Sequence, residues 1–258
     1  MSLVPQQSNP FHLQGVFLIT GGTRGIGRAI SIQFGRAGAR VIANYLQDEK
    51  AALTLRSIAE QEDLPIEVLR ANLSTSEGLK EIETRVKEAN LRLRGLVHCA
   101  ATGIHRPIDS LTGRHLDWTF ALNVRALFDL VKRLLPQFDG GACILAISSM
   151  GATRAVPLYT AVGASKGALE ALIRHLAAEL APRGIRANVL TPGAVMTDAW
   201  KAIPDAEARL AEAVRRSPIG RLVTVEELAF CAQFLCSPAA SGVNGQTLVV
   251  DGGTTIVA

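Results

Sequence analysis

The sequence has few cysteines, and their spacing excludes two common classes of site. The four cysteines, Cys99, Cys143, Cys231 and Cys236, form no Cys-x-x-Cys pair, and no histidine cluster accompanies them. This argues against a disulfide framework and against a bound metal. We therefore expect free, buried thiols in a reducing cytosol.

Signal-like, membrane-spanning and strongly basic segments are also missing. Residues 1–14 lack the basic and apolar regions of a signal peptide, and no apolar run reaches the length of a membrane span. Lysine and arginine number 27 against 23 for aspartate and glutamate, and this excess of four is spread along the chain. We expect a soluble, cytoplasmic protein that binds neither nucleic acid nor membrane.

Short apolar runs instead alternate with longer segments of helical period over the 258 residues. The runs are continuous, which is typical of a parallel sheet covered on both faces. Strands are predicted at 15–20, 40–45, 65–73, 95–101, 142–149, 185–193 and 246–253, and helices at 24–38, 49–61, 77–91, 116–135, from the region of Lys166 to about 180, and at 205–216.

This order predicts an α/β, single-domain, Rossmann-type doubly wound parallel sheet of about seven strands with helices on both faces. Residues 1–14 form an N-terminal extension, and residues 15–258 form the domain. The segment at about 194–218 interrupts the rhythm after a strand, which is a suitable place for a lid over a substrate site.

A glycine-rich turn, TGGTRGIG, follows the first predicted strand and opens the first helix. Gly21, Gly25 and Gly27 permit a tight turn and bring backbone N–H groups to a pyrophosphate at the helix N-terminus. A tight strand-to-helix connection also uses glycine for structural reasons alone. The strand before and the helix after favour a dinucleotide site.

The end of the second strand indicates which dinucleotide. A NAD site usually has an acidic residue there, but this chain has Asn44, Tyr45 and Leu46. Arg24, inside the glycine turn, can meet a 2′-phosphate, although a solvated arginine is the alternative. We therefore predict NADPH rather than NADH.

Tyr159 lies seven residues before Lys166 in VPLYTAVGASKGALEAL, and Val162 occupies the position four before the lysine. We predict both side chains on the first turns of a helix, where spacings of four and seven share a face. The alternatives are a helix-start tyrosine packed beside Pro157 and a solvated lysine.

Nearly the whole chain, about 15–253, resembles the short-chain dehydrogenase/reductase superfamily. The segments that carry the resemblance are TGGTRGIG, ISSMG, SKGALEALIRHLAAEL, IRANVLTPGAVMTD and GQTLVVDGG. It implies catalytic roles for Ser149, Tyr159, Lys166 and Asn123, with Ser148 as an alternative to Ser149 and a purely supporting role as the alternative for Asn123. It also implies a cofactor site formed by Gly21, Thr23, Arg24, Gly25, Ile26, Gly27, Asn44, Tyr45, Asn72, Leu73, Ala100, Ala101, Tyr159, Lys166, Pro192, Gly193, Val195 and Thr197, in which Asn72 is on the adenine side and Thr197 contacts the carboxamide.

Two features depart from the superfamily pattern. The Asn-Asn-Ala-Gly stretch after the fourth strand is here HCAA, in which His98 and Cys99 are expected to be packed strand residues. Tyr-x6-Lys also replaces Tyr-x3-Lys, and this spacing resembles the enoyl-acyl-carrier-protein reductases, above all their NADPH-preferring Bacillus type. On a helix the change moves the tyrosine by ~4.5 Å along the axis, away from the nicotinamide.

That displacement suits reduction of an enoyl thioester, because negative charge then develops on an oxygen two carbons from the site of hydride arrival. We therefore predict an NADPH-dependent enoyl-acyl-carrier-protein reductase of fatty-acid synthesis, acting on thioesters of acyl carrier protein or coenzyme A. The alternatives are a carbonyl reductase, such as a 3-oxoacyl reductase or alcohol dehydrogenase, and a non-catalytic NADP-binding sensor.

The remaining predictions concern the lid and the partners. Met196, Trp200 and Ile203 are candidates for a wall facing the acyl chain, although a plain amphipathic helix explains them nearly as well. Arg215 and Arg216 could meet an acidic carrier protein or could be solvated. The resemblance implies a homo-oligomer, a tetramer or a dimer.

Overall fold

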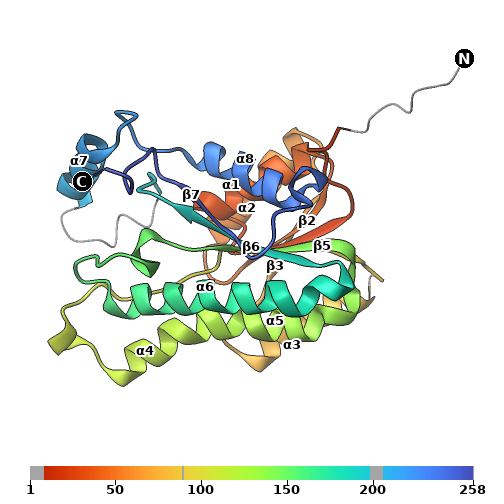
Figure 1. Cartoon of the computed structure of the whole chain (residues 1–258). Helices are drawn as coiled ribbons and strands as arrows, with labels where there is room; N and C mark the ends of the chain where they lie inside the picture. The colour runs from red at the N-terminus through yellow and green to blue at the C-terminus, as the bar shows by residue number, and fades with distance from the viewer. Residues whose placement is uncertain (1–8, 89, 198–205, 258) are drawn as a thin grey trace, which may run out of the picture.

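The computed structural model describes residues 9–88, 90–197 and 206–257. Its centre is one sheet of seven parallel strands in the order β3-β2-β1-β4-β5-β6-β7 (Figure 1). The strands are β1 (Val16–Thr20), β2 (Arg40–Tyr45), β3 (Ile66–Arg70), β4 (Leu93–His98), β5 (Phe138–Ile147), β6 (Arg186–Pro192) and β7 (Thr247–Val250). The predicted sheet is confirmed, because the continuous apolar runs fill strands such as β1 that are buried along their whole length.

Helices cover both faces of this sheet (Figure 1). The helices are α1 (Gly25–Arg36), α2 (Glu49–Gln61), α3 (Ser76–Glu88), α4 (Gly113–Phe120), α5 (Ala126–Leu134), α6 (Thr160–Leu180), α7 (Ala206–Arg216) and α8 (Val225–Cys236). Ile82 of α3, Leu127 of α5 and Leu169 of α6 belong to one apolar cluster. Phe34 of α1 and Leu228 of α8 belong to the other.

Two helical regions differ from the sequence prediction. Helix α8 was not predicted, although Thr224 and Glu227 form a capping box at its start, a pattern that is readable from sequence. The predicted helix over 116–135 is instead α4 and α5 joined by a π-helical turn, Ala121–Arg125. Such turns are frequent at functional sites, and this one carries Asn123.

The strand order reverses direction at β1, which has β2 on one side and β4 on the other. In doubly wound sheets the crevice beyond the carboxyl ends of two such strands binds the ligand. The glycine turn follows β1, and the HCAA stretch lies at the end of β4. The fold therefore places both segments at the same crevice.

Membrane-spanning helices and metal-binding clusters are both absent from the described residues. Within the ranges given above, no helix is long and apolar enough to cross a membrane. The same residues include no group of histidine, cysteine, aspartate and glutamate side chains arranged to hold a metal ion. The four cysteines are free thiols.

Candidate active site

The glycine turn packs tightly against the end of β4. Gly21 has φ +62°, and a Cβ atom there would lie 2.9 Å from the backbone nitrogen of Ala100. A Cβ at Gly27 would lie 2.1 Å from the carbonyl oxygen of Gly21. Only residues without a side chain leave room for this turn, so the free N–H groups of the first turn of α1 stay open to a ligand. The residues present fit a dinucleotide pyrophosphate.

Thr197 closes the other side of this crevice. A Cβ at Gly25 would lie 3.6 Å from Cγ2 of Thr197, so the segment after β6 reaches the glycine turn. Val195, two residues earlier, forms a parallel bridge with Val223. Pro192 ends β6, and a Cβ at Gly193 would lie 2.8 Å from Cα of Asp251. The structure therefore places the glycine turn and the segment after β6, both predicted to bind the cofactor, beside one another.

The adenine side of the predicted site is well connected. The Asn44 side chain donates to the carbonyl oxygens of Leu69 (3.4 Å) and Ala71 (3.0 Å) and so ties β2 to the end of β3. The Asn72 side chain accepts a hydrogen bond from the Ser74 N–H, 3.0 Å. Leu73 is buried beside it. The side-chain amides of Asn44 and Asn72 therefore hold the loops in place. Contacts with an adenine would fall to main-chain groups of these loops.

Charged groups surround the end of β2. Tyr45 donates its hydroxyl proton to Glu49, 2.7 Å, and this hydrogen bond is the main cause of its raised pKa. Arg70 donates to the carbonyl oxygen of Leu46, 3.0 Å. Arg24 is exposed at the N-cap of α1, where its side chain makes no capping bond. The Arg70 guanidinium thus lies at the segment where an acidic residue was missing, and Arg24 belongs to the glycine turn, whose Gly22 N–H donates to the Asn44 carbonyl oxygen.

Lys166 is buried at the carboxyl edge of the sheet. Its ammonium group donates to the carbonyl oxygen of Ile147, the last residue of β5, at 2.8 Å. Burial lowers its pKa to about 8, and Cys99 and Glu170 act in the opposite direction. The buried ammonium therefore loses its proton more readily than an exposed lysine does. The group lies at the crevice, where ribose hydroxyls would bind.

The two serines after β5 have different partners. Ser148 is buried and donates to Glu170, 2.6 Å. Ser149 accepts hydrogen bonds from the Tyr159 hydroxyl, 3.3 Å, and from the Gly151 N–H, 3.2 Å. Ser149, rather than Ser148, is therefore the serine that lies beside the tyrosine.

Tyr159 is not on the helix, and this part of the sequence prediction is wrong. It is the N-cap residue of α6, with φ −112° and ψ 13°, and α6 begins at Thr160. The residue before it, Leu158, has φ +65°, which few residues with side chains adopt. The offset from Lys166 is thus set by a turn as well as by helical rise. Burial raises the pKa of the Tyr159 phenol, and the hydrogen bond with Ser149 lowers it.

Val162 explains why the tyrosine is absent from the position four before the lysine. Its side chain is buried, and a Cβ on Gly103 would lie 2.1 Å from its Cγ2. The loop after β4 therefore covers this position directly. A phenol at residue 162 would need the space that this loop occupies.

Asn123 fastens the same loop. Its side-chain oxygen accepts from the Thr102 N–H, 2.8 Å, and its amide donates to the Thr102 carbonyl, 2.9 Å, and to the Ser165 hydroxyl, 2.9 Å. The π-helical turn, the loop and α6 are thus joined through one amide. This is the supporting role that was left open for Asn123. Just before Thr102, the Ala100 N–H donates to the Thr20 hydroxyl, 3.2 Å.

His98 is the buried strand residue that was predicted, and its hydrogen bonds also support the site. One ring nitrogen, Nδ1, lies 2.9 Å from the Thr20 hydroxyl, and Nε2 lies 3.2 Å from the Leu122 carbonyl oxygen. Burial lowers the pKa of His98 to about 3, and burial raises that of Cys99 to about 12. Both side chains are therefore neutral near pH 7. His98 therefore links β1 to the π-helical turn.

The predicted lid is described only in part. Met196 is 64% exposed, and Trp200 and Ile203 lie outside the described residues. On α7, Arg215 forms an ion pair with Glu212, and Arg216 is exposed.

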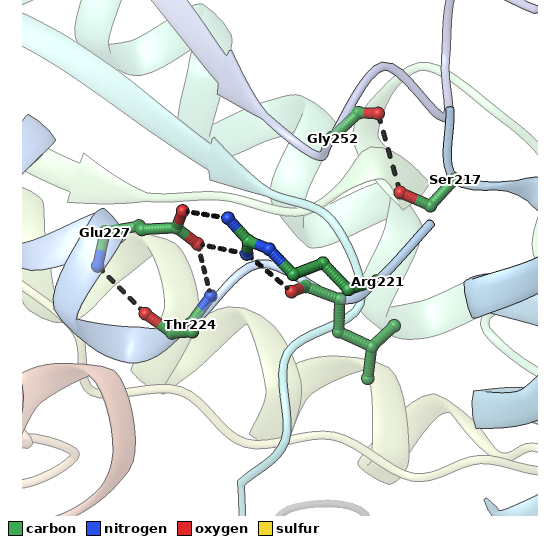
Figure 2. A network of polar contacts seen from close by, with 6 residues as sticks. Ser217, Arg221, Thr224, Glu227 and Gly252 are labelled. Carbon is green, nitrogen blue, oxygen red and sulfur yellow. Dashed lines mark hydrogen bonds and ion pairs between the residues drawn. The ribbon is translucent and has the colours of Figure 1, made fainter. Parts of the chain in front are cut away.

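The segment between α7 and α8 is fixed by a polar network (Figure 2). Arg221 and Glu227 form a two-pronged ion pair, with N–O distances of 2.9 and 2.7 Å. Glu227 also accepts from the Thr224 N–H, 2.8 Å, and Ser217 donates to the Gly252 carbonyl oxygen, 3.5 Å. The C-terminal end of α7 is thereby tied both to α8 and to the segment after β7.

Comparisons with known proteins agree with this geometry. The family model described as "Enoyl-(Acyl carrier protein) reductase" matches residues 21–255. The chain is 34% identical to 1-cyclohexenylcarbonyl-CoA reductase of Streptomyces collinus, over 98% of this chain and 91% of the relative. It is 33% identical to 7alpha-hydroxysteroid dehydrogenase of Escherichia coli K12, over 92% of each chain.

Solved structures are similar over almost the whole chain. A 7 alpha-hydroxysteroid dehydrogenase complexed with NADH and 7-oxo glycochenodeoxycholic acid has a TM-score of 0.88 and 31% identity, and 95% of this chain and 96% of that one are covered. A gluconate 5-dehydrogenase from Burkholderia cenocepacia in complex with NADP and tartrate has a TM-score of 0.87 and 30% identity, covering 96% and 98%. The chain therefore belongs to the short-chain dehydrogenase/reductase superfamily and is a short-chain oxidoreductase.

Proposed function

We propose that this oxidoreductase reduces the carbon–carbon double bond of α,β-unsaturated acyl thioesters, with NADPH as the reductant. The observation that carries the proposal is the pair of Val162 and Tyr159. Val162 is packed under Gly103 in the position where a phenol would stand four residues before Lys166, and the phenol is displaced to the N-cap of α6. A displaced proton donor suits an oxygen that is remote from the carbon receiving hydride.

The chemistry divides between cofactor and protein. When bound, NADPH would supply a hydride for a new C–H bond at the β-carbon, and the α,β π-bond electrons would move toward the thioester carbonyl. Tyr159 donates a hydrogen bond to the developing enolate oxygen, with Ser149 as its neighbour, which stabilises charge in the transition state. Lys166 adds positive potential at the crevice and holds the ribose hydroxyls. A proton from solvent then forms the second C–H bond at the α-carbon.

One relative supports this substrate class. The 1-cyclohexenylcarbonyl group named in the Streptomyces relative is itself an α,β-unsaturated acyl thioester when bound to coenzyme A. The family model names an acyl-carrier-protein substrate instead. We therefore propose enoyl thioesters as the class, on either carrier, with fatty-acid synthesis as the pathway in which an enoyl-acyl-carrier-protein reductase would act.

The direct test compares two thioesters of coenzyme A with purified protein and NADPH. We expect NADPH oxidation with the crotonyl thioester and at least ~10-fold lower kcat/KM with the acetoacetyl thioester, a difference of ~1.4 kcal/mol in transition-state binding. The opposite preference would establish the carbonyl-reductase alternative, which the hydroxysteroid dehydrogenase relative favours. NADPH binding without turnover of either thioester would leave the sensor alternative.

Arg24 tests the choice of cofactor. We expect Arg24→Ala to raise the KM for NADPH ~10-fold or more and to leave the KM for NADH within ~2-fold, since a charged hydrogen bond to the 2′-phosphate contributes ~1.5–3 kcal/mol. Arg36→Ala is the matched control, because Arg36 lies in the last turn of α1 and pairs with Glu62. Equal losses for both cofactors would contradict a 2′-phosphate contact.

We also propose a homo-oligomer and a cytosolic location. Three large apolar side chains on α4 and α5 are exposed, Leu116 at 44%, Trp118 at 47% and Phe128 at 46%, and subunit contacts cover side chains of this kind. Sedimentation of the purified protein as a monomer would oppose the first proposal. The free thiols suit a reducing compartment, and fractionation of cells would test the second.

A further inference from the structure

The position of the Tyr159 ring needs an explanation that the helix does not provide. Tyr159 precedes α6 and has no helical backbone conformation, so its side-chain direction is not fixed by helix geometry. Its hydroxyl has one side-chain hydrogen bond, the long contact of 3.3 Å with Ser149. Packing around the ring must therefore set where the hydroxyl points.

One packing contact comes from the turn after β5. A Cβ on Gly151 would lie 2.5 Å from both Cδ1 and Cε1 of Tyr159. The ring thus lies directly against the main chain at a position where only glycine leaves room. This contact restricts the position of the ring at Cδ1 and Cε1. Another element must restrict the rest of the ring.

The ring also lies near Gly163 of α6, where a Cβ would be 3.5 Å from Cδ1 of Tyr159, and it has a further contact with the imidazole of His105. Its ring centroid lies 5.3 Å from that of Tyr159, with an interplanar angle of 40°. Two aromatic rings at this separation are close enough to pack against one another. His105 is half-buried, so it keeps the phenol out of water as well as fixing the ring.

The loop that carries His105 is held firmly against α6. Asn123 makes two hydrogen bonds to Thr102, and Gly103 packs on Val162. His105 follows two residues later, so its main chain is anchored immediately before it. The loop that excludes a phenol from position 162 thus also supplies the ring that supports the phenol at 159.

The ring of His105 is neutral near pH 7. Burial lowers its pKa below the ordinary value of 6.5, and the charge of Arg209 on α7 lowers it further. A neutral imidazole supports the phenol without placing a positive charge beside it. Arg209 also shows that α7, in the predicted lid region, lies near this ring.

We propose that His105 is a positioning residue, whose imidazole packs on Tyr159 and holds the phenol hydroxyl beside Ser149 and toward the reacting oxygen. The inference rests on the proposed function of Tyr159, though it holds for an enoyl or a carbonyl substrate. His105 acts through the tyrosine and takes no part in proton transfer.

Three variants test this role: His105→Ala, His105→Phe and the exposed neighbour Arg106→Ala as control. With whichever thioester the wild type reduces, we expect His105→Ala to lower kcat ~10- to 100-fold and to leave the KM for NADPH within ~2-fold, because a misplacement of about 1 Å can cost ~100-fold. His105→Phe retains a ring and should restore kcat to within ~3-fold of wild type. Arg106→Ala should match wild type.

Two kinetic results would overturn the inference. One is an unchanged kcat in His105→Ala. The other is an equal loss in His105→Phe and His105→Ala, which would mean that the imidazole nitrogens rather than the ring are needed. The proposed function fails separately, because the wild type itself would then prefer the acetoacetyl thioester or reduce neither thioester.

A spectroscopic readout needs no substrate. The chain has two tyrosines, so NMR of protein labelled in its tyrosine rings gives two sets of signals, which Tyr45→Phe assigns. We expect His105→Ala to shift and broaden the Tyr159 signals as the ring gains freedom, and Arg106→Ala to leave them in place. Unmoved Tyr159 signals in a folded His105→Ala protein would contradict the contact itself.

Discussion

Replacing Tyr159 by phenylalanine lowers kcat with an enoyl thioester ~100- to 1,000-fold, the range found when one donor to a developing oxyanion is removed. The aromatic ring and its contacts with Gly151 and His105 remain in this variant, so the loss is assigned to the hydroxyl. NADPH binding, measured by the cofactor's fluorescence, stays within ~3-fold because the phenol supplies no charge to the cofactor.

Tyr45→Phe is the matched control for this substitution. It removes the same hydroxyl from the other tyrosine, which is bonded to Glu49 at the end of β2. Its effect should be confined to the KM for NADPH. A Tyr159→Phe enzyme with nearly full kcat would mean that another donor serves the substrate oxygen.

Lys166 should make activity fall as the pH rises through about 8. The burial that lowers its pKa to that value means that the free enzyme loses the ammonium charge above it. kcat/KM for NADPH reports the free enzyme, so it should decline above pH 8 in the wild type. Lys166→Met should lower kcat/KM ~100-fold at pH 7 and abolish the decline, since charged hydrogen bonds of ~1.5–3 kcal/mol are lost.

The same shift has the opposite sign for stability. An unfolded chain keeps this proton up to a pKa of 10.5, whereas the folded chain releases it at about 8. Between those values the unfolded state binds more protons, so the contribution of Lys166 to the free energy of unfolding increases with pH. Lys132→Met, at an exposed position on α5, is the control for both measurements. A decline in kcat/KM that persists in Lys166→Met would belong to another group.

The sheet and the glycine turn were predictable because their signals are local. Continuous apolar runs specify buried parallel strands, and glycines between a strand and a helix specify a phosphate turn. The structure agrees at β1 and at Gly21. Contacts between distant segments carry no such local signal.

Tyr159 and His98 are two residues whose surroundings could not be predicted from such local signals. The helical pattern around Lys166 gives no indication that Leu158 adopts φ +65°. The tyrosine was therefore predicted on the helix, whereas α6 begins one residue after it. His98 has hydrogen-bond partners that lie 78 and 24 residues away in sequence. The π-helical turn likewise depends on Asn123 reaching Thr102 and Ser165, which no spacing in the sequence announces.

The contact of Gly103 with Val162 has a consequence for how this scaffold can diversify. A variant with tyrosine at 162 would meet the β4 loop, because that loop already fills the space. Retreat of the loop alone removes the support for the existing phenol through His105. Relocating the phenol to the position four before Lys166 thus requires coordinated changes in two segments of the chain.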